Sequence, residues 1–183
     1  MVKEFLETFI LVFVAEMGDK TQLLLMTLAA KYSVIQVLAG IFLGVLINHG
    51  SAVFIGCLIS NITDEYILQL FAGVIFIIFG IITLVFEDEG ENKKLYSLGP
   101  VITVALTFFL GEMGDKTQLT CMTLSMDAVY PLIVLAGSVT AMVSIGFIGI
   151  IVGTSLTKFL PSYIIKTISG LIFIIFGIMR LIV

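Results

Sequence analysis

The seven-residue sequence EMGDKTQ occurs twice in this chain of 183 residues, at Glu16–Gln22 and again at Glu112–Gln118. Each copy interrupts a long apolar stretch and brings an acid pair and a lysine into it. The rest of the chain is dominated by apolar stretches, since 60% of its residues are hydrophobic and 12% are charged. Soluble domains are closer to half apolar and a quarter charged. The composition therefore indicates an integral membrane protein that lies in a lipid bilayer.

Six apolar stretches are long enough to cross a bilayer as helices, which takes roughly 20 residues for about 30 Å of hydrocarbon. The connections between them are short, except for a polar segment that reads EDEGENKKLYSLG. We therefore expect an all-α membrane protein with six transmembrane helices and no soluble catalytic domain. The expected spans cover residues 5–30, 34–59, 66–86, 100–125, 130–156 and 163–182.

Two further sequence blocks indicate that the two halves of the chain are copies. VLAG at Val37–Gly40 returns at Val134–Gly137, and GVIFIIFGI at Gly73–Ile81 returns with one change at Gly170–Ile178. Each half holds three spans, an odd number, so the second half must enter the membrane from the opposite side. Such inverted repeats are typical of secondary transporters. We predict three parts, namely a first three-helix repeat over 1–86, a cytosolic acidic linker over 87–99 and a second three-helix repeat over 100–183.

Basic residues between the spans predict the orientation. Loops 30–34, 87–99 and 156–166 carry five lysines, against Lys3 and Arg180 on the other side. The positive-inside rule then places the linker in the cytosol and both termini outside. We expect neither a cleavable signal nor a targeting extension, and therefore expect a prokaryotic plasma (inner) membrane. Nucleic acid is excluded as a partner, because the sequence has no basic patch.

Of the 9 basic and 13 acidic residues, six lie deep within the expected spans, and all six belong to the repeated motif. Each charge at the bilayer centre costs at least about 2.5 kcal/mol, so six would cost on the order of 15 kcal/mol if they faced lipid. Positions i, i+3 and i+4 share one face of a helix, so the charges of each motif should project together. We expect them to face one another, water or a ligand. They are Glu16, Asp19, Lys20, Glu112, Asp115 and Lys116.

The motifs also supply neutral groups that suit a cation. Two glycines let the backbone open as a hinge, and two hydroxyls and two amides add oxygen atoms; these residues are Gly18 and Gly114, Thr21 and Thr117, and Gln22 and Gln118. Oxygen-rich sites favour hard cations such as Ca²⁺, Mg²⁺ and Mn²⁺. Four carboxylates and two lysines sum to −2, a charge that one divalent cation or two protons would neutralise. This balance predicts the exchange of one divalent ion for about two protons.

The pattern E-x-G-D-[KR]-[TS], once in each three-helix half, resembles the signature of the small cation/proton exchangers. That family includes the Golgi manganese/calcium transporter and bacterial manganese exporters. Both copies match at every position, and the resemblance covers essentially the whole chain. It implies that Mn²⁺ or Ca²⁺ is a transported substrate rather than a cofactor, and that the protein exports it from the cytosol by alternating access. The implied metal ligands are Glu16, Asp19, Glu112 and Asp115.

Several alternatives stay open for individual residues. The buried acids could form Glu–Lys bridges that only hold helices together, although such bridges stabilise little. Lys20 and Lys116 could compensate charge or carry protons. His49, next to Asn48 in the second span, could be a packing residue, a proton relay or an added ligand. The second half has Ile145 and Gly146 at the matching positions, so a role for this pair would break the symmetry of the repeats.

Two rival functions also remain. A channel for the same cation would need the same ligands, although inverted halves with titratable ligands favour exchange. An intramembrane aspartyl protease would use Asp19 and Asp115 as a dyad that shares one proton. Each aspartate here has its own glutamate and lysine neighbours, which argues against an enzyme. The GxxxG-type pairs Gly40/Gly44 and Gly149/Gly153 fit close helix packing within one chain or in a homo-oligomer.

Overall fold

The computed structural model describes residues 1–17, 25, 28–29, 31–62, 64–85, 99–159 and 162–182. Within these ranges every regular element is an α-helix and no strand is present, which confirms the all-α class. The predicted linker lies outside them, apart from Gly99. The helices are α1 (Val2–Glu16), α3 (Val34–Ser60), α4 (Glu65–Val85), α5 (Pro100–Gly111), α6 (Lys116–Met126), α7 (Pro131–Phe159) and α8 (Ser162–Ile182).

In the described part of the chain, two helical stretches are long and apolar enough to cross a membrane. They are Val34–Ser60, which is α3, and Pro131–Ile151 in α7. Shorter apolar stretches lie in α4, α5 and α8. Local sequence sets the beginnings of these helices. Ser33 and Gln36 form a capping box at the start of α3, in which each side chain bonds the other residue's backbone N–H.

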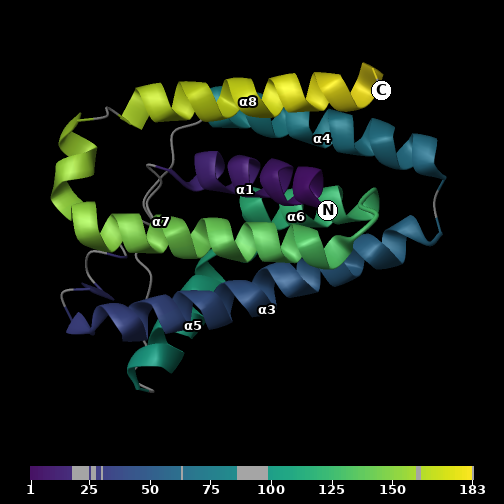
Figure 1. Cartoon of the computed structure of the whole chain (residues 1–183). Helices are drawn as coiled ribbons and strands as arrows, with labels where there is room; N and C mark the ends of the chain where they lie inside the picture. The colour runs from purple at the N-terminus through teal and green to yellow at the C-terminus, as the bar shows by residue number, and fades with distance from the viewer. Residues whose placement is uncertain are drawn as a thin grey trace.

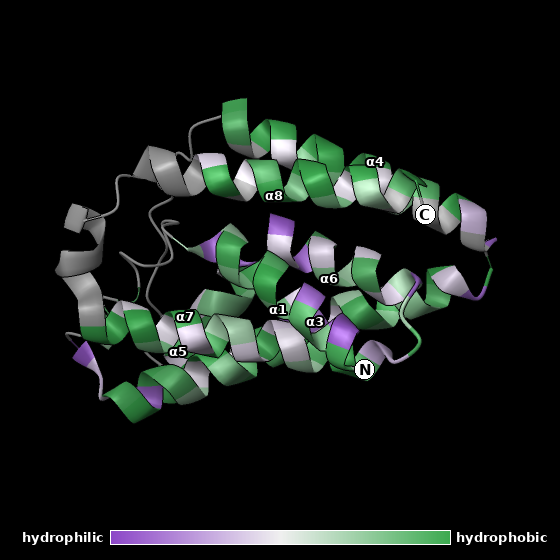
Figure 2. Cartoon of the chain, turned by 45° about the horizontal axis from the view of Figure 1, so that its top comes forward, coloured by the Kyte–Doolittle hydropathy of each residue, from purple (hydrophilic) through white to green (hydrophobic). Residues whose placement is uncertain are grey.

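The helices form layers, with α4 and α8 side by side on one side of the molecule (Figure 1). The next layer contains α1 and α6. Helix α1 contacts α7, α6 contacts α3 and α7, and α5 packs on α3. Hydrophobic residues occupy most of α4 and α8 (Figure 2). The buried core between the layers contains both apolar side chains, such as Val12, Ile41 and Val104, and an unusual number of threonines.

Close contact of glycines joins α4 to α8. A Cβ atom added to Gly73 would lie 2.9 Å from the backbone oxygen of Gly177, and one added to Gly80 would lie 2.6 Å from that of Gly170. The residue numbers run in opposite directions, so the two helices are antiparallel. Between these glycine pairs the rings of Phe76 and Phe173 stack with centroids 6.0 Å apart. Small residues thus let the two backbones touch along their length.

The structure differs from the sequence prediction in the fourth expected span. A single helix over 100–125 is wrong, because α5 ends at Gly111 and α6 begins at Lys116. Gly114, with φ of 79°, has a left-handed backbone that an α-helix cannot contain and that glycine adopts without steric cost. The second motif therefore has no continuous helical face, and its glutamate, aspartate and lysine do not align in the way that an i, i+3, i+4 spacing would require.

Candidate metal centre

The break between α5 and α6 holds the two acids of the second motif. Glu112 follows the last residue of α5 with φ −97° and ψ 0°, and Asp115 is the extended N-cap residue of α6. Aspartate is a preferred residue at a helix N-cap, where its charge also faces the positive end of the helix dipole. Each acid is thus fixed at a helix end by its own local backbone.

The glutamate of the first motif also lies at a helix end. Glu16 is the last residue of α1, and the backbone is extended at Met17, with ψ of 119°. Helices leave their last four carbonyl groups without partners inside the helix. The carboxyl ends of α1 and α5 therefore bring partial negative charge to the neighbourhood of Glu16 and Glu112. The negative charges of the two glutamates and the partial negative charges of the two helix ends both favour a bound cation.

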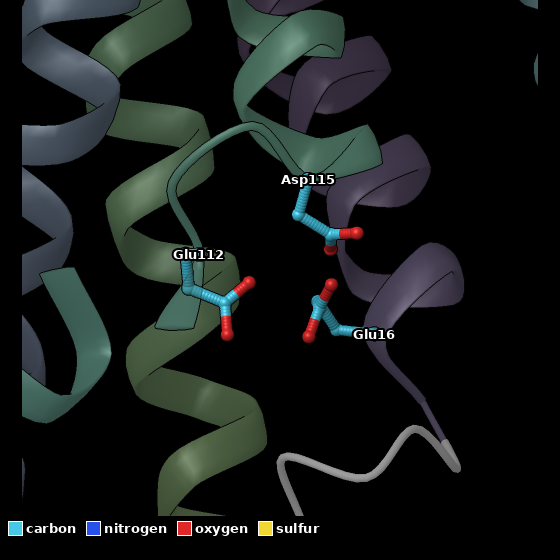
Figure 3. A group of neighbouring side chains, drawn as sticks. All are labelled: Glu16, Glu112 and Asp115. Atoms are coloured by element: carbon cyan, nitrogen blue, oxygen red, sulfur yellow. The ribbon is translucent and has the colours of Figure 1, made fainter. Parts of the chain in front are cut away.

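Three carboxylates meet at this point, and their side chains point toward one another (Figure 3). One oxygen atom from each of Glu16, Glu112 and Asp115 lies within 4.8 Å of the others. Glu16 is fully buried, Glu112 is 2% exposed and Asp115 is half-buried. Two negative charges at this separation repel by about 3 kcal/mol with an effective dielectric constant of 20. A bound cation or bound protons would relieve this repulsion.

The chemistry of this cluster is that of a hard cation site. The potential ligand atoms are all carboxylate oxygens, which suit Ca²⁺, Mg²⁺ and Mn²⁺ better than soft metals. The first motif's remaining predicted residues lie outside the described part of the chain, so the cluster has three carboxylates here rather than the expected four. Those residues are Gly18, Asp19, Lys20, Thr21 and Gln22.

The second motif continues into the first turn of α6. Lys116 begins the helix and is half-buried, whereas Thr117 is fully buried. Gln118 closes the break, because its Oε1 accepts a 2.6 Å hydrogen bond from the backbone N–H of Gly114. Its Nε2 donates to the backbone oxygen of Asn48 in α3 at 3.5 Å. Gln118 thus ties the carboxylate cluster to α3.

Asn48 and His49 are both fully buried in the middle of α3. Neither the amide of Asn48 nor the ring nitrogens of His49 make a hydrogen bond within the described residues. The two side chains occupy different faces of the helix.

The face of α3 that carries Asn48 was predicted only in part, as the pair Gly40/Gly44. Small residues recur at every fourth position on both sides of it, as Gly40, Gly44, Ala52 and Gly56, and all are buried. The four-residue spacing of small residues indicates such a face, and the GxxxG pair Gly40/Gly44 is its first part. Successive members of this row are neighbours on the helix surface, and Gly40, Gly44 and Gly56 all contact the α5–α6 segment.

The described part of the chain is thus an all-helical protein with two helical stretches long and apolar enough to cross a membrane, and with three carboxylates gathered at helix ends. A model of the family described as "Divalent cation/proton antiporter GDT1" matches residues 4–91 and 100–183. The chain belongs to this family.

Individual relatives agree with the family model. A Vibrio cholerae protein named "Putative manganese exporter" is 35% identical over 109 residues, which cover 59% of this chain and 54% of that protein. A rice protein named "GDT1-like protein 1, chloroplastic" is 25% identical over 210 residues, covering 97% of this chain and 61% of the relative. The chain thus spans little more than half the length of these two relatives. No solved structure matches it.

Proposed function

We propose that this protein exchanges a divalent cation, Mn²⁺ or Ca²⁺, for protons across a membrane and exports the metal from the cytosol. The observation that carries the proposal is the buried cluster of Glu16, Glu112 and Asp115, with oxygen atoms within 4.8 Å of one another. Carboxylates this close can be neutralised by a metal ion or by protons, but the two compete for the same oxygens. Competition at one site is the requirement for exchange.

The proposed alternating access rests on two inverted three-helix repeats in a six-span arrangement. The packing of α4 on α8 supports it. Phe76 and Phe173 are equivalent under the 97-residue offset, and they stack on each other. Gly73 meets Gly177 and Gly80 meets Gly170, so each glycine contacts the equivalent of the other. Such reciprocal pairing is expected next to a two-fold axis, and two antiparallel equivalents fit halves of opposite topology.

The proposed orientation places 87–99 in the cytosol and both termini outside, in a prokaryotic plasma membrane. The lysine distribution supports it under the positive-inside rule. The name of the Vibrio cholerae relative supports manganese as one substrate and export as the direction. We further propose that one metal ion exchanges for about two protons, as the charge of four carboxylates and two lysines requires.

The direct test is metal-driven proton movement in proteoliposomes. The purified protein is reconstituted with a pH-sensitive dye inside the vesicles, and Mn²⁺, Ca²⁺, Mg²⁺ or Zn²⁺ is added outside. We expect Mn²⁺ or Ca²⁺ to change the internal pH for the wild type and not for the double variant Glu16→Gln/Glu112→Gln. Metal entry without proton movement would instead indicate a channel, and strongly voltage-dependent flux would contradict the proposed stoichiometry.

A further inference from the structure

The face of α3 that carries Asn48 packs directly on α5 and α6. A Cβ atom on Gly44 would collide with the backbone oxygen of Ala105 in α5, and one on Gly56 would collide with that of Met122 in α6. Residue numbers rise together along these contacts, so α3 runs parallel to the α5–α6 segment. Asn48 lies one turn after Gly44 on the same face. It is therefore level with the region between Ala105 and Met122, which contains the break that holds Glu112 and Asp115.

Gln118 independently places Asn48 beside this break. Its side chain bridges the two, since one end is 2.6 Å from the backbone nitrogen of Gly114 and the other is 3.5 Å from the backbone oxygen of Asn48. Gly114 lies between the two acids of the second motif. A single glutamine side chain thus spans the separation between the backbone of α3 and the backbone of the carboxylate cluster.

The side chain of Asn48 is buried and has no hydrogen-bond partner among the described residues. It is 0% exposed, and neither Oδ1 nor Nδ2 makes a hydrogen bond within the described residues. Leaving such a group unsatisfied costs about 1–3 kcal/mol. Two other buried side chains, both threonines, do make hydrogen bonds. Thr107 and Thr120 both donate to the backbone oxygen four residues earlier, so the lack of a partner is particular to a few groups.

We propose that Asn48 is a neutral ligand of the divalent cation, whose Oδ1 binds the same ion as Glu16, Glu112 and Asp115. This inference rests on the proposed function and names a further residue of its site. Asparagine oxygens are common ligands of Ca²⁺, which takes six to eight oxygen atoms. A neutral oxygen adds a coordination bond without adding negative charge. It therefore raises the affinity for the metal relative to the affinity for protons, whereas carboxylates alone bind both.

The ligand would come from the first repeat only. Ile145 stands at the position of the second repeat that matches Asn48 under the 97-residue offset, and it offers no oxygen from its side chain. The metal site would then be asymmetric although the motifs that supply its acids are identical.

The test compares Asn48→Leu with the wild type in detergent, by thermal unfolding and by titration with Mn²⁺ and Ca²⁺. Leucine has a similar volume but no polar atoms, so we expect the metal-free variant to be at least as stable as the wild type. Its metal affinity should fall by about 10- to 100-fold, the loss typical of removing groups that support a bound metal. Asn48→Asp keeps an oxygen at this position and should retain binding. Asn48→Ala removes the same oxygen without apolar bulk, and replaces the leucine variant if that fails to fold.

The opposite pattern would overturn the inference. If Asn48→Leu lowers the stability of the metal-free protein and leaves metal affinity unchanged, the amide has a structural role. Failure of the proposed function gives a different result, because the wild type would then show no metal binding, or Glu112→Gln would bind as the wild type does. Wild-type binding that depends on Glu112 but not on Asn48 would reject this inference alone.

Discussion

Glycine lets helix backbones touch in two regions of this protein, and the two contacts enclose different chemistry. Between α4 and α8, four glycines approach the opposite backbone, and the buried side chains described there are apolar, with Phe76 and Phe173 at the centre. Between α3 and the α5–α6 segment, glycines again meet backbone atoms. The second contact, however, encloses buried polar groups, including Asn48 and Thr117.

The difference indicates that close packing serves two purposes in one molecule. In the α4–α8 pair it gives van der Waals contact, which is the main force between helices in lipid. In the α3–α5–α6 contact it brings the buried amide of Asn48 close to the break that holds Glu112 and Asp115. The first region should therefore determine stability and the second should determine metal binding. Substitutions in each region can test this division.

The largest effect is expected for Glu112→Gln. It removes one charge from the carboxylate cluster, so metal-driven proton exchange should fall at least about 100-fold, as expected when an essential ligand is lost. The metal-free variant should remain folded, so that the loss of exchange reports on the site. Exchange is measured in proteoliposomes and stability by thermal unfolding in detergent.

Asp64→Asn is the matched control for this prediction. It removes the same charge from an exposed position between α3 and α4. Exchange should remain near the wild-type rate. An equal loss of exchange in both variants would show that overall charge, rather than the cluster, controls transport.

A smaller effect is expected for Gly114→Ala. Gly114 has φ of 79° and no atom within 4 Å of an added Cβ, so alanine meets backbone strain but no collision. Left-handed backbone costs other residues about 1–2 kcal/mol. Relief of this strain would move Glu112 relative to Asp115, and we expect about a 10-fold loss of metal affinity, the size of effect that ligand misplacement produces.

Gly99→Ala separates strain from ligand geometry. Gly99 has φ of 94° and equally open surroundings, but it caps α5 at the end away from the carboxylates. Both variants should lose similar stability in thermal unfolding, and only Gly114→Ala should lose metal affinity. Loss of affinity in both would mean that the whole of α5 positions the site.

Sequence alone predicted much of the fold, because apolar length and internal repetition are strong signals. Helices α3, α4, α7 and α8 lie within a few residues of the predicted spans. Gly114 was predicted as a hinge, but the expected span ran through it as one helix, although the positive φ of Gly114 separates α5 from α6. A composition-based prediction cannot register one residue's backbone angle.

The site was predictable in its residues but not in its geometry. Charges inside apolar spans identified Glu16, Glu112 and Asp115, which lie together. The helical spacing used to group them was wrong for the second motif, since the acids meet across a break and not along one face. The row of small residues in α3 marks the face that carries Asn48, but it does not tell which distant segment packs on that face.

Gly177→Ala tests the apolar contact. Its Cβ would lie 2.7 Å from the backbone oxygen of Gly73, so α4 and α8 must separate. Overpacking of this kind costs about 1–3 kcal/mol, which we expect as reduced thermal stability in detergent. Metal affinity of the folded protein should equal that of the wild type. A large loss of affinity would contradict the division between the two regions.

The smallest effect, and of opposite sign, is expected for Gly50→Ala. Gly50 lies inside α3, two residues after Asn48, but on another face, where the nearest atom to an added Cβ is Leu135 Cδ2 at 4.0 Å. Alanine in a helix interior is about 0.5–1 kcal/mol more favourable than glycine, so thermal stability should rise slightly. Metal affinity should not change. A clear loss of stability would mean that close backbone contact in α3 extends beyond the face of Gly44, Asn48 and Gly56, and the polar contact would then be wider than the row of small residues indicates.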